Sequence, residues 1–237
     1  ASFVLFLPDD HGDCEGKGSG LPLPIANVFV NNTTIGSATD AAGRFRISGE
    51  FSTDIELVAS FVGYVTEVKA ISFRKKGEVQ VDFDLAFNES NLTEIELKAK
   101  RDKSWDREFR RFEEVFLALP DDPYLKQVKI ENPWVLEFEN IKPKKGPNYL
   151  QASAGQPLKI TNEALGYKID YYLQDFRLVR NGSMFYGQVF YSPTVSSAPA
   201  QVKDWEANRE ANYQSSLRHF NYSLLINSSD SLHFKVF

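Results

Sequence analysis

The sequence has few of the residues from which most metal and nucleophilic sites are built. Its 237 residues include one cysteine, Cys14, and three histidines, His11, His219 and His233. A single cysteine excludes an intrachain disulfide, and zinc needs several converging histidine, cysteine or carboxylate ligands. No histidine lies in an H-x-x-E or H-E-x-x-H pattern. We therefore expect no catalytic residue, no cofactor and no metal site, and we predict that the chain is not an enzyme.

A basic excess, a long apolar run and a phosphate loop are also lacking. The formal net charge is -5 at pH 7. Because nonspecific nucleic-acid binding needs a basic surface, we expect no nucleic-acid partner. No segment reaches the roughly 18 apolar residues of a membrane-spanning helix, and the short apolar run Phe3–Leu7 fits a strand. The run Gly16–Gly20 lacks the G-K-[ST] ending of a phosphate loop, and no G-x-S-x-G motif occurs.

The few residues that could carry chemistry have structural explanations. His219 lies among apolar residues of a predicted helix, which favours a hydrogen-bonded structural histidine. His11 and Cys14 fall in the acidic stretch Pro8–Gly20, which we predict to be a solvent-exposed loop or an insertion. A nucleophilic cysteine needs an activating partner, and the sequence assigns none to Cys14.

Aromatic residues, by contrast, are abundant: the chain has 19 phenylalanines and 10 tyrosines, and 42% of it is hydrophobic. This composition favours β-sheet packing. In the first half, Ala26, Val28 and Val30 alternate with their neighbours, and Phe45 and Ile47 share one face. Similar alternation at 55–61, 79–85 and 95–97, with turn residues between, predicts about seven strands in an antiparallel sandwich.

Short motifs in this half carry a family resemblance. They are Pro22-Leu23-Pro24-Ile25-Ala26-Asn27-Val28, Thr33 to Gly36, Thr39-Asp40, Gly43-Arg44-Phe45-Arg46-Ile47 and Phe61-Val62-Gly63-Tyr64. Together they resemble the carboxypeptidase regulatory-like domain, a transthyretin-like β-sandwich common in envelope proteins of Bacteroidetes. The resemblance implies that residues 1–98 form an accessory sandwich rather than a peptidase.

The second half, residues 99–237, is predicted to be an α+β domain. Ser104 can cap a helix whose aromatic residues fall on one stripe, and this helix should end before Pro120. A second amphipathic helix is predicted from Trp205 to Leu225, after a loop at 194–201. Both helices should pack an aromatic stripe on a sheet. The stripes are Trp105, Phe109, Phe112 and Phe116, and Trp205, Tyr213, Leu217, Phe220 and Leu224.

Strands are expected between these two helices. The longest candidate is Tyr167–Val179, in which the pattern of large residues indicates a register shift along the strand. The remaining candidates are 128–130, 135–138, 150–152, 158–161 and 184–191.

Three blocks of the second half are similar to uncharacterised Bacteroidetes proteins that carry the regulatory-like domain at their N-terminus. The blocks are Ile130–Phe138 with the preceding aromatic stripe, Pro157–Tyr167, and Tyr213–Phe220. This resemblance implies an envelope location and brings no established activity. Because Leu232–Phe237 has a strand pattern at the end of the chain, we expect the domain to continue beyond Phe237.

Two function classes remain. The first is a non-catalytic structural or interaction module, a periplasmic, outer-membrane-associated subunit that docks on an outer-membrane protein complex. The alternative is an envelope receptor for a glycan or peptide, with exposed aromatic rings as stacking platforms. Candidate rings are Trp134, Tyr172, Tyr186 and Tyr191, although each also fits a core position.

Overall fold

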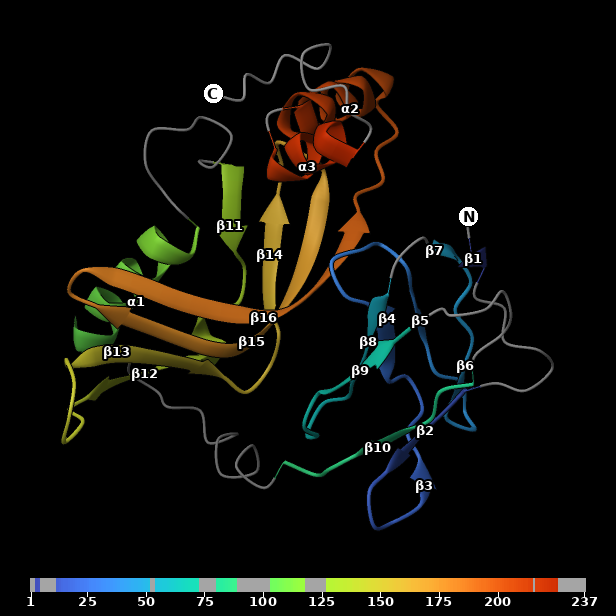
Figure 1. The fold of residues 1–237 in the computed structure, drawn as a ribbon, viewed down its shortest axis with the longest axis horizontal. Helices are drawn as coiled ribbons and strands as arrows, with labels where there is room; N and C mark the ends of the chain where they lie inside the picture. The colour runs from blue at the N-terminus through green and yellow to red at the C-terminus, as the bar shows by residue number, and fades with distance from the viewer. Residues whose placement is uncertain are drawn as a thin grey trace.

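The computed structural model describes residues 3–4, 12–51, 54–72, 80–88, 103–117, 127–214 and 216–225. Figure 1 shows two β-rich units side by side: the N-terminal half forms one, and the C-terminal half forms the other with its helices. The predicted class, a β-sandwich followed by an α+β unit, is confirmed. The predicted boundary at residue 98 and the predicted strand at 95–97 lie outside the described residues.

The N-terminal unit is a sandwich of two four-stranded sheets. One sheet has the order β5-β4-β8-β9; in the other β10, β3 and β6 pair with β2, and a separate ribbon joins β1 and β7. The strands are β1 (Phe3–Val4), β2 (Gly12–Gly16), β3 (Leu21–Pro22), β4 (Asn27–Val30), β5 (Gly36–Ala38), β6 (Arg44–Phe45), β7 (Glu50–Phe51), β8 (Ile55–Ser60), β9 (Glu67–Ile71) and β10 (Phe83–Leu85).

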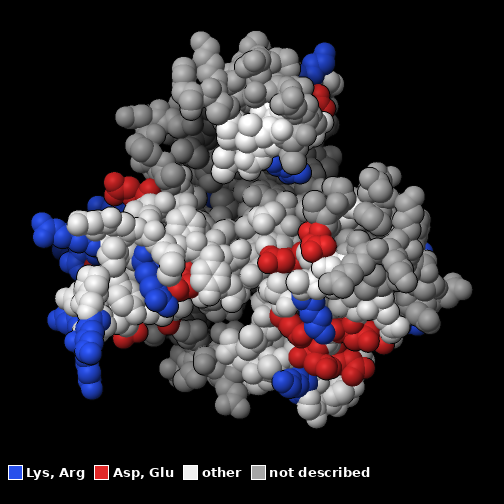
Figure 2. Space-filling model, viewed as in Figure 1, with Lys and Arg blue, Asp and Glu red and all other residues white. Residues whose placement is uncertain are grey.

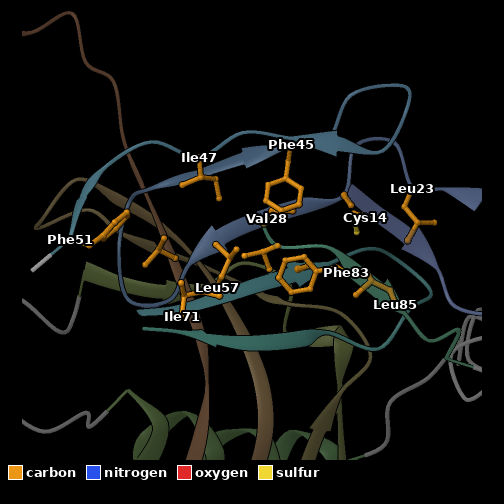
Figure 3. Packing of buried hydrophobic residues seen from close by; sticks show 14 residues of the cluster. Cys14, Leu23, Val28, Phe45, Ile47, Phe51, Leu57, Ile71, Phe83 and Leu85 are labelled. Carbon is orange, nitrogen blue, oxygen red and sulfur yellow. The ribbon is translucent and has the colours of Figure 1, made fainter. Parts of the chain in front are cut away.

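The sandwich core lies between these sheets, and its side chains come from alternate positions of each strand. Phe45 and Ile47 descend from one layer toward Val28 and Leu57 of the other (Figure 3). The predicted facing of Phe45 and Ile47 is therefore confirmed. The turn between β5 and β6 also behaves as its composition predicts, because the Asp40 carboxylate accepts hydrogen bonds from the backbone N–H of Ala42 and Arg44.

The expectation of a loop over Pro8–Gly20 is wrong for its second half. Gly12–Gly16 forms β2, and Cys14 is completely buried between the sheets. This strand lacks an apolar signal because its inward positions are Gly12, Cys14 and Gly16. A methyl group at Gly12 would overlap the Val81 carbonyl oxygen and the Phe45 ring, so the close approach of these neighbours requires glycine. The extra strand also explains why the two sheets exceed the predicted seven strands.

The C-terminal unit is built on a six-stranded sheet. One edge of the long strand β15 pairs with β14 and then β13, and its other edge pairs with β16. The predicted register shift in this strand is present as an irregularity between Leu173 and Asp175. The strands are β11 (Val128–Ile130), β12 (Leu136–Ile141), β13 (Tyr149–Ala154), β14 (Leu158–Asn162), β15 (Tyr167–Val179) and β16 (Gly182–Pro193), with a 3₁₀ turn, η3 (Pro133–Val135), before β12.

Helix α1 (Lys103–Phe116) covers one face of this sheet with the predicted aromatic stripe. The Phe112 ring is fully buried, with its centroid 4.7 Å from that of Phe176. The Trp105 indole N–H donates a hydrogen bond of 3.0 Å to the Leu136 carbonyl. The helix begins one residue before the predicted Ser104 cap, and residues 118–126, where its predicted end at Pro120 falls, lie outside the described residues.

The second predicted helix is two helices, α2 (Pro199–Gln214) and α3 (Leu217–Leu225). Proline at the first position of α2 extends it into the predicted loop. The Ser216 hydroxyl accepts a hydrogen bond from the His219 backbone N–H, as a helix N-cap does. This cap begins α3 as a separate helix. The expected aromatic stripe is buried only in part, because Trp205 is 7% exposed, whereas Leu217 is 72% exposed and Leu224 is 49% exposed.

Backbone pairing joins the two units at the turn after β4. The Asn32 N–H donates to the Val189 carbonyl over 2.9 Å, and the Tyr191 N–H donates to the Thr33 carbonyl over 3.0 Å. The Asn31 side-chain oxygen accepts the Val189 N–H at 2.8 Å, while its amide nitrogen donates to Glu56 at 2.7 Å. We call these contacts the junction. They pair residues 189–191, which we call the inner part of β16, with the edge of the sandwich.

Aromatic packing reinforces the junction. The Phe29 ring lies 5.1 Å from the rings of both Tyr172 and Phe190, between centroids. Val58 completes this small buried cluster. Gly36 leaves room for Phe190, since a methyl group there would stand 2.9 Å from the Phe190 ring. The units are therefore held by polar pairing and by aromatic burial together.

A Gly12→Ala substitution should destabilise the sandwich by about 1–3 kcal/mol, because the added methyl group overpacks the contact with Val81 and Phe45. The measurement is urea unfolding followed by tryptophan fluorescence and circular dichroism. Gly182→Ala is the matched control, since its added carbon would meet no atom within 4 Å. Equal stabilities for the two variants would contradict the crowding at β2.

An Asn31→Ala substitution should lower the free energy of unfolding by about 1–3 kcal/mol, because it leaves the Val189 N–H without its acceptor at the junction. Urea denaturation of both proteins measures this loss. Asn148→Ala removes an exposed amide from a turn and should change stability by less than about 0.5 kcal/mol. A junction variant as stable as this control would show that the side-chain bonds of Asn31 contribute nothing.

Candidate functional site

The histidines do not form a site in the described part of the chain. His219 is buried, and its Nδ1 lies 2.8 Å from the Gln214 carbonyl oxygen, which agrees with the structural role predicted for it. His11 and His233 lie outside the described residues. Within the described ranges, no group of three or more histidine, cysteine or acidic residues could hold a metal ion.

Cys14 is a core residue of β2 rather than a loop residue. Burial, together with the nearby carboxylates of Glu67 and Asp84, raises the pKa of its thiol from 9.0 to about 11. The thiolate is the nucleophilic form of cysteine, so this environment makes Cys14 unreactive at neutral pH.

The four aromatic candidates divide into core and surface residues. Tyr172 is 5% exposed, and burial raises the pKa of its hydroxyl from 10.0 to about 12; it belongs to the junction and offers no stacking face. Tyr191 is half-buried and packs edge-on against Tyr167. Trp134 and Tyr186 are surface residues, with 61% and 58% of their areas exposed. The four rings do not form one exposed platform, since Tyr172 is buried and Tyr191 is half-buried, while Trp134 lies on η3 and Tyr186 on the outer half of β16.

An open cleft of about 350 Å³ lies where α2 meets the turn between β14 and β15, with Gln127, Glu163, Asp204 and Asn208 on its walls. The turn is held tightly by α2, because side chains of Trp205, Asn208 and Arg209 donate to four successive carbonyls, those of residues 163–166. Trp205 is only 7% exposed, and its indole N–H is already bonded. The cleft therefore offers little aromatic surface to a ligand.

The most distinctive surface is the outer half of β16, residues 182–187, which we call the free edge. Met184, Phe185 and Tyr186 follow one another here with 52%, 38% and 58% of their areas exposed. The Phe185 ring faces α1, 5.3 Å from the Phe116 ring between centroids. Because side chains alternate along a strand, Met184 and Tyr186 point to the opposite face.

Among the described residues, the free edge has backbone hydrogen-bonding groups that no strand pairs with. Val189 and Tyr191 bond to the junction, so odd-numbered residues of β16 point their N–H and C=O groups away from β15. By the same alternation, Ser183, Phe185 and Gly187 point theirs outward. Among the described residues, no strand pairs with β16 on this side beyond the single bridge of Phe190 with Thr33.

Other sheet edges in the described residues are short or carry charges, which discourage edge-to-edge pairing. Strand β12 carries Glu137 and Glu139, β11 carries Lys129, and β5 has three residues. Strand β16 has twelve residues and no charged side chain. The residue pattern at 184–191 predicts this strand, and Tyr186 is one of the candidate rings, but its place at an edge is not predicted because strand order is not encoded in a local pattern.

The buried Cys14 thiol should make the protein less stable at alkaline pH. The native thiol keeps its proton up to a pKa of about 11, whereas an unfolded thiol ionises near 9.0. The stability contribution is thus complete below pH 9 and falls between pH 9 and 11, by up to about 1.4 kcal/mol per pH unit. Urea unfolding across this range, with Cys14→Ala for comparison, measures the effect. Identical pH profiles for the two proteins would contradict it.

No helix among the described residues is long and apolar enough to cross a membrane.

Comparison with known proteins gives a family match for the sandwich alone. No curated protein matches the chain. Residues 12–97, which include the strands from β2 to β10, match the CarboxypepD_reg-like domain family.

Proposed function

We propose that this chain is a non-catalytic interaction module of the bacterial cell envelope, a periplasmic subunit that docks on an outer-membrane protein complex in Bacteroidetes. The observation that carries the proposal is the free edge at residues 182–187. A partner segment in extended conformation adds to this edge as a further strand, with backbone hydrogen bonds to Ser183, Phe185 and Gly187.

Three features of the free edge suit strand addition. Its outward backbone groups recur at every second residue, which is the spacing that an incoming strand presents. Exposed Met184 and Tyr186 flank the edge and offer apolar contact to alternate side chains of the partner. The neighbouring Gln188 side-chain oxygen is buried without a hydrogen-bond partner among the described residues, so a donor from the partner would satisfy it.

The junction supports the same mode of binding. Residues 31–33 of the sandwich already pair with the inner part of β16, which shows that this side of the strand accepts backbone partners. The partner strand would continue outward from that point. The CarboxypepD_reg-like match over residues 12–97 supports the accessory role of the sandwich in this arrangement.

The alternative, an envelope receptor for a glycan or a peptide, has weaker support. The cleft beside α2 is open, and the Trp205 ring on its wall is almost completely buried. A stacking platform needs an exposed ring face. A peptide in extended conformation would fit the free edge. In that case the peptide-binding alternative and the docking proposal describe the same contact, with the peptide as a segment of the partner.

Lysines placed on the free edge should abolish docking. In the Met184→Lys/Tyr186→Lys variant, two charges flank the edge and disfavour strand pairing. The measurement is quantitative mass spectrometry of proteins that co-purify with the full-length protein from gently solubilised outer membranes. We expect a stoichiometric partner with the wild type and at least about tenfold less with the variant, equivalent to about 1.4 kcal/mol of binding free energy.

Val62→Lys/Val195→Lys is the matched control, because it places two lysines at apolar positions that are 77% and 94% exposed and lie outside residues 182–187. This control should keep its partner. A protein recovered alone would overturn the subunit proposal, and a partner that both variants retain would place docking elsewhere. Amide hydrogen exchange adds a direct readout: Ser183, Phe185 and Gly187 should exchange fast in the free protein and slowly in the complex.

A further inference from the structure

One end of the C-terminal sheet carries a group of exposed cations. The turn between β12 and β13 contains Lys142, Lys144 and Lys145, and the turn between β15 and β16 contains Arg180; all four are exposed. Strands β13 and β15 pair at Leu150 and Leu178, which places both turns at the same end of the sheet. Figure 2 shows Lys and Arg gathered over these two hairpins, at the left of the view. We call this surface the basic end.

Few acidic groups balance the basic end. Arg177 beside it is paired with Asp175, and its guanidinium lies 5.7 Å from the centre of the Tyr149 ring. Glu139 of β12 is the other acidic residue of the adjoining strand ends. Among the described residues, none of the four cations of the basic end takes part in an ion pair. Acidic residues gather instead over β2, β9 and β10 of the sandwich, in the lower right of Figure 2.

The chemistry of these cations favours an extended anionic surface over a protein pocket. Three of the four are lysines, which are strongly hydrated point charges on flexible stems and are depleted in protein–protein interfaces. They lie on two projecting turns, one of which contains Pro143, Gly146 and Pro147. Cations spread in this way are attracted most strongly to a surface that carries many negative charges, such as a bilayer rich in anionic lipid.

We propose that the basic end is a membrane-contact surface that binds anionic phospholipid headgroups, with Lys142, Lys144, Lys145 and Arg180 as the contacting residues. This inference does not rest on the proposed docking at the free edge. It gives the chain a peripheral membrane attachment that needs no spanning segment. The acidic sandwich orients the molecule, because an anionic bilayer repels that side while it attracts the basic end.

The test is co-sedimentation of the full 237-residue chain with vesicles of phosphatidylglycerol and phosphatidylcholine, and with vesicles of phosphatidylcholine alone. We expect binding only to the anionic vesicles, with loss of binding as salt rises from about 0.05 M to about 0.5 M. A lysine near an anionic surface strengthens binding about fivefold, so the triple variant Lys142→Gln/Lys144→Gln/Lys145→Gln should bind about 100-fold more weakly.

Lys168→Gln/Lys203→Gln/Arg218→Gln removes three exposed cations elsewhere on the C-terminal unit and is the matched control; it should bind as the wild type does. Equal losses in the two variants would show that net charge alone governs binding and would overturn the proposal. Absence of vesicle binding would overturn it too, and so would binding of soluble poly-glutamate at least as tight as binding of the anionic vesicles. Circular dichroism confirms that each variant is folded.

Discussion

The backbone pairing between β16 and the turn at residues 31–33 is the constraint on which the arrangement of the whole molecule depends. Asn31 makes it specific, because one amide both accepts the Val189 N–H and donates to Glu56 within the sandwich. The Phe29, Tyr172 and Phe190 rings pack together beside this contact. Hydrogen bonding and aromatic burial act together here, so the two units hold a defined relation.

This pairing also decides what remains available for function. The sandwich occupies only residues 189–191 on one side of β16, so the backbone groups at residues 182–187 have no strand partner on that side among the described residues. In most monomeric proteins such an edge is shortened or charged. Here the strand is long and uncharged, and its large exposed side chains, Met184, Phe185 and Tyr186, are apolar or aromatic. This combination is the reason why we propose that a partner strand pairs with the edge.

The charge distribution gives the molecule a second kind of asymmetry. Basic turns lie at the far end of the C-terminal sheet, and acidic residues lie on the sandwich. In the proposals above, the two surfaces have separate tasks, since the basic end contacts lipid and the free edge contacts protein. Arg180 of the basic end lies in the turn that leads directly into the free edge, so a membrane-bound molecule would present its free edge close to the bilayer.

Much of the fold follows from local sequence. The aromatic stripe of α1 and the register shift in β15 are both predicted by residue spacing, because the period of a helix or strand is a local property. The prediction fails at β2, where glycine and cysteine form the buried face, and at Ser216, where a single cap divides one helix into two. At β2 the close neighbours Val81 and Phe45, which are distant in sequence, require glycine. At Ser216 a single hydrogen bond interrupts the helical pattern.

By itself, the sequence determined the two-part organisation, the sandwich motif of the N-terminal half and the identity of most strands. Only the tertiary structure decided which strand lies at an edge, which aromatic rings are buried and which turns share one end of the sheet. The physical reason is that exposure depends on contacts between residues far apart in the chain. Tyr172 and Tyr186 are both tyrosines of adjacent strands, yet one is 5% and the other 58% exposed, because the sandwich covers only the first.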